Sequence, residues 1–220
     1  MPLELQDVDF EDGEAISLLQ LSVFYDDIFN KTLFPGMSFD SLLAAAVARW
    51  PNDYSEPGCR YKKVVDTTTD EIVSFTKWKF INTHEDVKLP GQTGVPSSYI
   101  PSSPRAAAEG RDVQFSTDFV NKCLAIKTPL VGDRARMELH TLVTMPSHRR
   151  RGAASLMLEW ATKFADQNGL ICWTTASKEG LPLYQSFGFE IRGLVEMPMI
   201  DGSTSVSTCI LRECRPCVAE

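Results

Sequence analysis

The sequence predicts a mixed α/β fold (α+β), in which a mostly antiparallel central sheet with one parallel pair of strands is flanked by helices. Three observations indicate this class. An apolar segment at 137–145, a helical segment at 152–167 and a second apolar segment at 170–175 follow one another, which is typical of a strand–helix–strand unit with parallel strands. Strand-like segments joined in pairs by short turns indicate antiparallel hairpins. The chain has 220 residues, of which 43% are hydrophobic and 23% charged, so it can bury a core.

The N-terminal quarter is predicted to contain one strand and two helices. Residues 3–10 alternate between apolar and polar side chains, as a half-buried strand does. Asp12 is a good N-cap for a helix whose apolar residues recur at helical spacing as far as Phe29. A second helix begins at Ser38 or shortly after it. We expect Pro51 to end this helix, because proline removes a helical hydrogen bond.

The middle of the chain changes in composition. Residues 60–66 and 71–81 are predicted to form two strands of a hairpin. Residues 82–111 are rich in Pro, Gly and Ser and form an insertion, which is either a long irregular loop or partly disordered. Such a loop can cover a binding site or can simply be exposed to solvent. Helical spacing returns at 112–126, an extra helix, and residues 128–136 are predicted to be a loop.

The C-terminal part is predicted to alternate strands and helices. Residues 137–145 are apolar and β-branched, and Pro146 should end their strand because proline cannot donate to a sheet. Residues 152–167 carry apolar side chains at helical spacing. A second, short helix begins at Ser177 or the next residue. The remaining predicted strands are 170–175, 189–197 and 205–212.

Composition and charge argue against several functions. The formal net charge of −7 disfavours a general nucleic-acid surface, and no stretch approaches the roughly 20 apolar residues of a membrane span. The N-terminus shows no signal-peptide pattern, so we expect a cytoplasmic protein, with nuclear entry open. The six cysteines are too sparse for a disulfide framework, and no spacing predicts a metal site. We expect one domain over residues 1–220, as a monomer or homodimer.

A basic turn connects the strand at 137–145 to the helix at 152–167. Gly152, Ala153 and Ala154 have little or no side chain, so a ligand can approach the backbone N–H groups of the first helical turn. These groups lie at the positive end of the helix dipole and bind anions, most naturally phosphate. The three arginines at 149–151 add charged donors.

Two motifs in this region resemble those of the GNAT superfamily of acyl-CoA-dependent N-acetyltransferases. The first is the strand end Leu142-Val143-Thr144-Met145-Pro146, followed by Arg149-x-x-Gly152-x-Ala154. The second is a short helix with a tyrosine before Gly-Phe, here Tyr184 and then Gly188-Phe189. The resemblance covers about residues 135–192 and implies a GNAT fold. The chain departs from the family pattern at Ala154, where a second glycine is common, and at Ser177, where many members have asparagine.

The resemblance implies that acetyl-CoA is the co-substrate and that no metal is needed. The pyrophosphate of coenzyme A should lie on the turn at 149–155, and its pantetheine arm should run along the preceding strand. The residues implied in cofactor binding are Leu142, Val143, Thr144, Met145, Arg149, Arg150, Arg151, Gly152, Ala153, Ala154, Ser155, Ser177 and Tyr184.

Glu138 and His140 are the candidate proton acceptors. By the alternation of a strand, Glu138, His140, Leu142 and Thr144 share one face, and two titratable residues on an apolar strand are unusual. The resemblance implies that these positions point toward the acceptor amine, with Glu138 as base or proton relay and His140 assisting. Alternatively, Glu138 pairs with Arg136 or Arg134, and His140 is a hydrogen-bonded core residue.

Tyr184 is the candidate general acid. By resemblance, it matches the tyrosine that protonates the sulfur of coenzyme A, and a phenol is protonated at neutral pH. Alternatively, Tyr184 only packs the short helix.

The resemblance implies that the chain is an acyltransferase. We expect it to transfer an acetyl group from acetyl-CoA to a primary amine of a small molecule by direct attack. One alternative is a protein lysine or N-terminal acetyltransferase, which needs an open acceptor groove. Another is a non-catalytic acyl-CoA-binding module, which the Ser177 departure permits.

Overall fold

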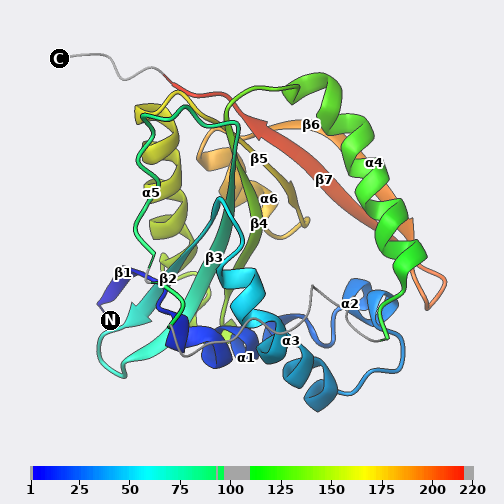
Figure 1. Cartoon of the computed structure of the whole chain (residues 1–220). Coiled ribbons are helices and arrows are strands. Elements are labelled where there is room, and N and C mark those ends of the chain that lie inside the picture. Colours follow the sequence, from blue (N-terminus) through cyan, green and yellow to red (C-terminus); the bar gives the residue numbers. More distant parts are fainter. Residues whose placement is uncertain (1, 93, 97–109, 216–220) are drawn as a thin grey trace.

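The computed structural model describes residues 2–92, 94–96 and 110–215, and they form a sheet of seven strands in the order β1-β2-β3-β4-β5-β7-β6 (Figure 1). All neighbouring strands are antiparallel except β4 and β5, which are parallel. The predicted mixed, mostly antiparallel sheet is confirmed. The strands are β1 (Leu3–Asp7), β2 (Cys59–Asp66), β3 (Glu71–Ile81), β4 (Arg136–Thr144), β5 (Ile171–Ala176), β6 (Glu190–Pro198) and β7 (Thr204–Arg212).

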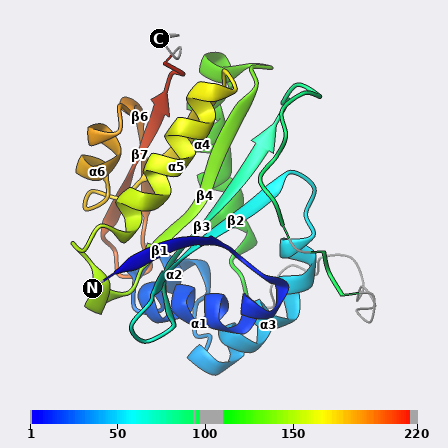
Figure 2. The same cartoon turned by 90° about the vertical axis from the view of Figure 1, so that its left-hand side faces the viewer.

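Helices cover both faces of the sheet. Figure 2 shows α5 in front of the sheet and α4 behind it. The α-helices are α1 (Gly13–Phe24), α2 (Ile28–Leu33), α3 (Phe39–Tyr54), α4 (Val113–Val131), α5 (Ala153–Gln167) and α6 (Leu181–Ser186). Two short 3-10 helices, η1 (Phe10–Asp12) and η2 (Pro146–His148), precede α1 and the basic turn. None of the helices in the described part of the chain is both long and apolar enough to cross a membrane.

The core on the face of α1 to α4 is divided into two clusters. One cluster packs α1 and α3 onto β2, β3 and β4 and includes Trp50, Phe75 and Val143. The other packs α2 and α4 onto β5, β6 and β7, with Phe115 against Trp173. On the opposite face, α5 packs over β4 in a cluster that includes side chains of β3, β5 and β7. The division between the first two clusters therefore follows the boundary between β4 and β5.

The parallel pairing of β4 and β5 is short. It joins Arg136–Glu138 to Ile171–Trp173, although β4 continues to Thr144 and β5 to Ala176. The Thr174 hydroxyl donates to the carbonyl of Leu139 at 2.9 Å and forms the last link between the strands. Beyond this point β4 remains paired with β3 and leaves β5. The two strands therefore separate toward their carboxyl ends.

A β-bulge interrupts the alternation of β4 at His140. Lys77 pairs with Thr141 and Trp78 with Leu139, so His140 is an extra residue in its strand. The prediction that Glu138 and His140 share one face of the strand is confirmed, because their side chains approach each other. The prediction that Leu142 lies on the same face is wrong. Leu142 packs against α5 on the opposite face, because the bulge shifts the strand by one residue.

Two prolines lie inside helices instead of ending them. The prediction that Pro51 ends a helix is wrong, because α3 continues to Tyr54. Tyr54 is 1% exposed and its hydroxyl donates to the carbonyl of Val8, so tertiary contacts stabilise the last turn. Likewise α4 contains Pro129 and ends at the buried Val131, which makes part of the loop predicted at 128–136 helical.

Two further predictions on the polar segments are adjusted. The helix predicted to reach Phe29 is two helices, because Asp27 accepts the N–H of Phe29 at 2.8 Å and caps α2. The insertion predicted at 82–111 lies partly outside the described residues. Its described residues 82–92 and 94–96 form neither helix nor strand, as expected of an irregular loop.

Candidate active site

A cavity of about 820 Å³ lies where β4 and β5 separate, between the two core clusters on the face covered by α1 to α4. His140 and Thr141 of β4 line it together with Thr175 and Ala176 of β5 and the following Ser177. Residues of α1, α2, α3 and α4 line the other side. This volume is typical of a small-molecule site. The divided core therefore leaves room for a ligand directly over the separated strands.

The basic turn has the geometry of an anion site. Arg150 and Gly152 adopt left-handed backbone conformations, with φ of 63° and 93°, and Gly152 is the N-cap of α5. Successive N–H groups in such a turn form a concave anion-binding surface. The first N–H groups of α5 have no partner inside the helix. Arg149, Arg150 and Arg151 are exposed and form no ion pair with the described residues.

A buried contact between a histidine and a carboxylate holds this turn against the sheet. His148 Nε2 lies 3.4 Å from the Asp66 carboxylate at the end of β2, and Asp66 is completely buried. The N–H of Thr68 and the His148 ring lower the pKa of Asp66. Ser147 Oγ lies 2.9 Å from the other ring nitrogen. The sequence gives no signal for this pair, because Asp66 and His148 are far apart in the chain and neither belongs to a motif.

The edge of β4 facing the gap leads from the cavity to the basic turn. Met145 donates its N–H to the carbonyl of Val73, and the Val143 carbonyl accepts the Ser74 hydroxyl, so these two residues face β3. By alternation, the backbone groups of Leu142 and Thr144 face the open side. Of the four strand residues predicted to contact a cofactor, these two therefore offer free backbone groups.

Glu138 is held by two cations. Lys127 Nζ lies 3.0 Å from each carboxylate oxygen, and Arg136 Nε donates at 2.7 Å. Burial alone would raise the pKa of Glu138, but Arg136 and Lys127 outweigh it and lower the pKa. Glu138 therefore pairs with Arg136, as the alternative prediction for this residue stated. Glu138 also lies 4.0 Å from His140 Nε2, so the structure brings both predicted proton acceptors together.

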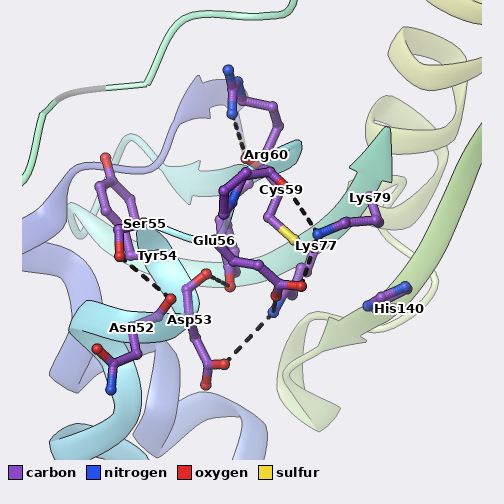
Figure 3. Close-up of polar contacts among 12 residues, drawn as sticks. Asn52, Asp53, Tyr54, Ser55, Glu56, Cys59, Arg60, Lys77, Lys79 and His140 are labelled. Atoms are coloured by element: carbon purple, nitrogen blue, oxygen red, sulfur yellow. Dashed lines mark hydrogen bonds and ion pairs between the residues drawn. The ribbon is translucent and has the colours of Figure 1, made fainter. Parts of the chain in front are cut away.

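His140 lies on the cavity wall. Its side chain is 42% exposed, and Figure 3 shows it extending from β4 on the side of Lys77 and Lys79. Partial burial and then the charge of Lys77 lower the pKa of His140, while Glu138 opposes this shift. A neutral imidazole on the cavity wall can accept a proton at neutral pH.

A charged network on β3 and the end of α3 adjoins His140. Lys77 Nζ lies 3.2 Å from Glu56 and 3.9 Å from Asp53, and Lys79 lies 2.8 Å from Glu56 (Figure 3). Burial opposes the ionisation of Glu56, but the two lysines lower its pKa to about 2. None of these residues was among the predicted site residues. The sequence feature that could have indicated them is the presence of two lysines at alternate positions of a strand rich in aromatic residues.

The predicted acid, Tyr184, lies apart from the cavity wall. It is 8% exposed, packs edge-to-face on Phe189 and belongs to the core under α5. Burial raises its pKa to about 12, so the phenol keeps its proton. Its hydroxyl has no hydrogen-bond partner among the described residues. Ser177 does line the cavity, and its hydroxyl accepts the N–H of Gly180 at 3.2 Å.

A family model described as an acetyltransferase (GNAT) domain matches residues 118–191. This segment includes Glu138, His140, the basic turn and Tyr184. No curated protein sequence matches the chain significantly.

Solved structures, among them acetyltransferases, share the fold. A histone acetyltransferase HPA2-related protein from Corynebacterium glutamicum has a TM-score of 0.61 at 16% identity, over 99% of this chain and 100% of that one. The C-terminal condensation domain of Ebony, in complex with beta-alanyl-dopamine, has a TM-score of 0.68 at 14% identity, over 97% and 99%. Arabidopsis thaliana NAA60 in complex with acetyl-CoA has a TM-score of 0.53 at 12% identity, over 96% and 98%.

The family-model match over residues 118–191 and the fold shared with solved acetyltransferases agree with the resemblance predicted from the two motifs.

We expect Glu138→Gln to destabilise the protein by about 3–5 kcal/mol at pH 7, because it leaves two partly buried cations without their buried anion. The folded-state pKa of Glu138 is lowered, so its contribution is complete above the unfolded-state pKa and is lost as pH falls through the folded-state pKa. Denaturant unfolding from pH 7 downward should therefore show the variant and the wild type converging in acid.

Glu190→Gln is the matched control, because Glu190 forms a 2.7 Å ion pair with Arg192 but its side chain is 68% exposed. This control should change stability by less than about 1 kcal/mol. Equal losses in both variants would contradict a special role for the Glu138 pair.

Proposed function

We propose that the chain is an acetyl-CoA-dependent N-acetyltransferase that acetylates a primary amine of a small molecule by direct attack, without an acyl-enzyme. The observation that carries this proposal is the open edge of β4. It runs from the cavity wall at His140 and Thr141 to the basic turn at 149–152. A thioester carrier with a phosphorylated end can lie along such an edge with its acyl group at the cavity.

The chain's own groups suit coenzyme A. The N–H groups of the turn and the three arginines would bind the pyrophosphate, and the buried Asp66–His148 pair would hold the turn in place. The backbone groups of Leu142 and Thr144 would pair with the amides of the pantetheine arm. When bound, acetyl-CoA supplies the reactive thioester.

The reaction requires a proton acceptor and a proton donor. The amine nitrogen attacks the thioester carbonyl, a C–N bond forms and the C–S bond breaks. We assign the amine proton to His140, which is neutral and faces the cavity. Glu138 stays ionised between its two cations and acts through His140 as a positioning residue. The Tyr184 hydroxyl, which keeps its proton, would protonate the departing sulfur.

A small acceptor is favoured over a protein, because the cavity has the volume of a small-molecule site and helices line the side opposite the strands. Residues of α1, α2, α3 and α4 all contribute to its wall. The Ebony domain, which shares the fold, binds beta-alanyl-dopamine, a small amide, and this supports a compact acceptor site in such a fold.

Acetyl-CoA should raise the temperature of unfolding, because a ligand that binds the folded state stabilises it. The absence of any shift at saturating acetyl-CoA would rule out the cofactor. Gly152→Ala should reduce the shift, since it disturbs the left-handed N-cap of α5 at φ 93°. Gly169→Ala at the other end of α5 is the control. Gly169 also has a positive φ, of 64°, and open space where a Cβ would lie, so this variant should leave the shift intact.

The pH dependence of turnover should follow the charges around His140. Lys77→Met removes a cation and should move the acidic limb to higher pH, because the pKa of His140 rises. Glu138→Gln removes an anion and should move it to lower pH. The acceptor amine titrates identically in all three proteins, so the differences report the enzyme group. Coincident profiles would exclude His140 as the base.

Tyr184→Phe should lower kcat by about 10²-fold or more, the usual contribution of a general acid. Because the Tyr184 hydroxyl bonds to no described residue, this substitution removes one oxygen and should change neither the fold nor the affinity for acetyl-CoA. Turnover kinetics and acetyl-CoA titration measure the two quantities separately. Unchanged kcat would leave Tyr184 only its packing role.

A further inference from the structure

Two cysteine side chains meet between α4 and β7. Cys123 of α4 packs against the cluster of buried side chains that contains Cys209 of β7, and the two thiols are hydrogen-bonded to each other. Cys209 is completely buried, whereas Cys123 is half-buried. A small solute can therefore reach one sulfur of the pair, while the other sulfur contacts only the protein.

Helix α4 lies against β6 and β7 (Figure 1), and a glycine permits its close approach. Gly193 of β6 lies directly across from Cys209 in the pairing of β6 with β7. A Cβ at Gly193 would lie 2.9 Å from the Cδ1 methyl group of Ile126, so the helix occupies the space that a side chain would need. Ile126 follows Cys123 by three residues and lies on the same side of α4. The contact of Ile126 with Gly193 therefore places Cys123 beside Cys209.

The middle of α4 is weakly anchored to the sheet. Its buried residues, Phe115 and Val131, lie near its two ends, whereas α5 on the other face has six buried residues along its length. Phe119, one turn before Cys123, lines the cavity. Lys127, one turn after Cys123, binds a buried carboxylate of β4. A covalent bond at Cys123 would fix the part of α4 that contributes to the site.

We propose that Cys123 and Cys209 form a reversible disulfide when the protein is exposed to a hydroperoxide, and that this bond fixes α4 on β7. Hydrogen peroxide oxidises the Cys123 thiol to a sulfenic acid, and one water leaves. The Cys209 sulfur then displaces the hydroxyl group, which leaves with the Cys209 proton as a second water. The two thiols lose two electrons in total, the peroxide gains them, and a dithiol reductant reverses the reaction by exchange.

Hydrogen peroxide added to the purified, reduced chain should lower its mass by the two hydrogen atoms of the thiols. Trypsin digestion without reductant should then yield the peptide of residues 123–127 linked to that of residues 193–212, each of which contains one cysteine. The unfolding temperature should rise by roughly 5 °C or more, because the bond closes a long loop of the unfolded chain. Dithiothreitol should reverse this shift. Cys123→Ser should abolish both the cross-link and the shift.

Cys214→Ser is the matched control, because Cys214 is also half-buried but lies beyond the end of β7. This variant should keep both the cross-link and the shift. Free thiols at Cys123 and Cys209 after peroxide treatment would overturn the proposal. A disulfide from Cys123 to another cysteine, or an equal shift in Cys123→Ser, would overturn it as well.

Hydrogen exchange tests whether the bond fixes α4. The amides of α4 should exchange more slowly in the oxidised chain than in the reduced chain, with little change in α5, because the cross-link suppresses local opening of α4. Unchanged exchange in α4 would overturn this part of the proposal.

Gly193→Val tests the geometry that brings the thiols together. It should slow the formation of the cross-link several-fold, since a side chain at Gly193 pushes Ile126 and α4 away from the sheet. Leu194→Val is the matched control, because Leu194 is the next residue of β6, points to the other face and is 57% exposed. Equal rates in both variants would show that the approach of α4 at Gly193 does not control the bond, and would overturn the proposed geometry.

Discussion

The short parallel pairing of β4 with β5 is the constraint on which the site depends. β4 stays hydrogen-bonded to β3 along its length, and the Met145 N–H still reaches Val73 after the strand ends. Strand β4 therefore stays with β3 and is not paired with β5 beyond Trp173. The separation divides the core beneath α1 to α4 into two clusters, and the cavity lies between them. The same separation leaves the β4 edge free as far as the basic turn, so the cavity and the open strand edge have one cause.

The bulge at His140 gives two neighbouring titratable residues different surroundings. Glu138 lies in the regular part of β4, faces α4 and is enclosed by Lys127 and Arg136. His140 is the extra residue of the bulge and remains partly exposed to the cavity. A buried carboxylate between two cations is a weak base, whereas an imidazole of lowered pKa is available as a proton acceptor at neutral pH. The local backbone, more than the residue type, makes Glu138 and His140 differ as proton acceptors.

The sequence predicted the order of strands and helices because periodicity and turn chemistry are local. It also predicted the basic turn before α5, whose small residues determine its backbone. Predictions from the sequence were wrong where contacts between distant segments determine the local structure. Pro51 lies inside α3 because Tyr54 is buried against Val8, and the bulge at His140 follows from the pairing of β4 with β3. The Asp66–His148 and Glu56–Lys77 pairs join segments that no spacing rule connects.

The two ends of the site differ in whether their charged side chains are paired with other residues. At the turn, three exposed arginines and a helix start offer positive charge that no described residue neutralises. At the cavity, Lys77 pairs with Asp53 and Glu56, and aromatic side chains line part of the wall. Attraction to an exposed basic turn is long-range and weakens with salt, whereas contact with buried rings is short-range and insensitive to salt. The two ends of the site therefore differ in how salt affects their attraction for a ligand.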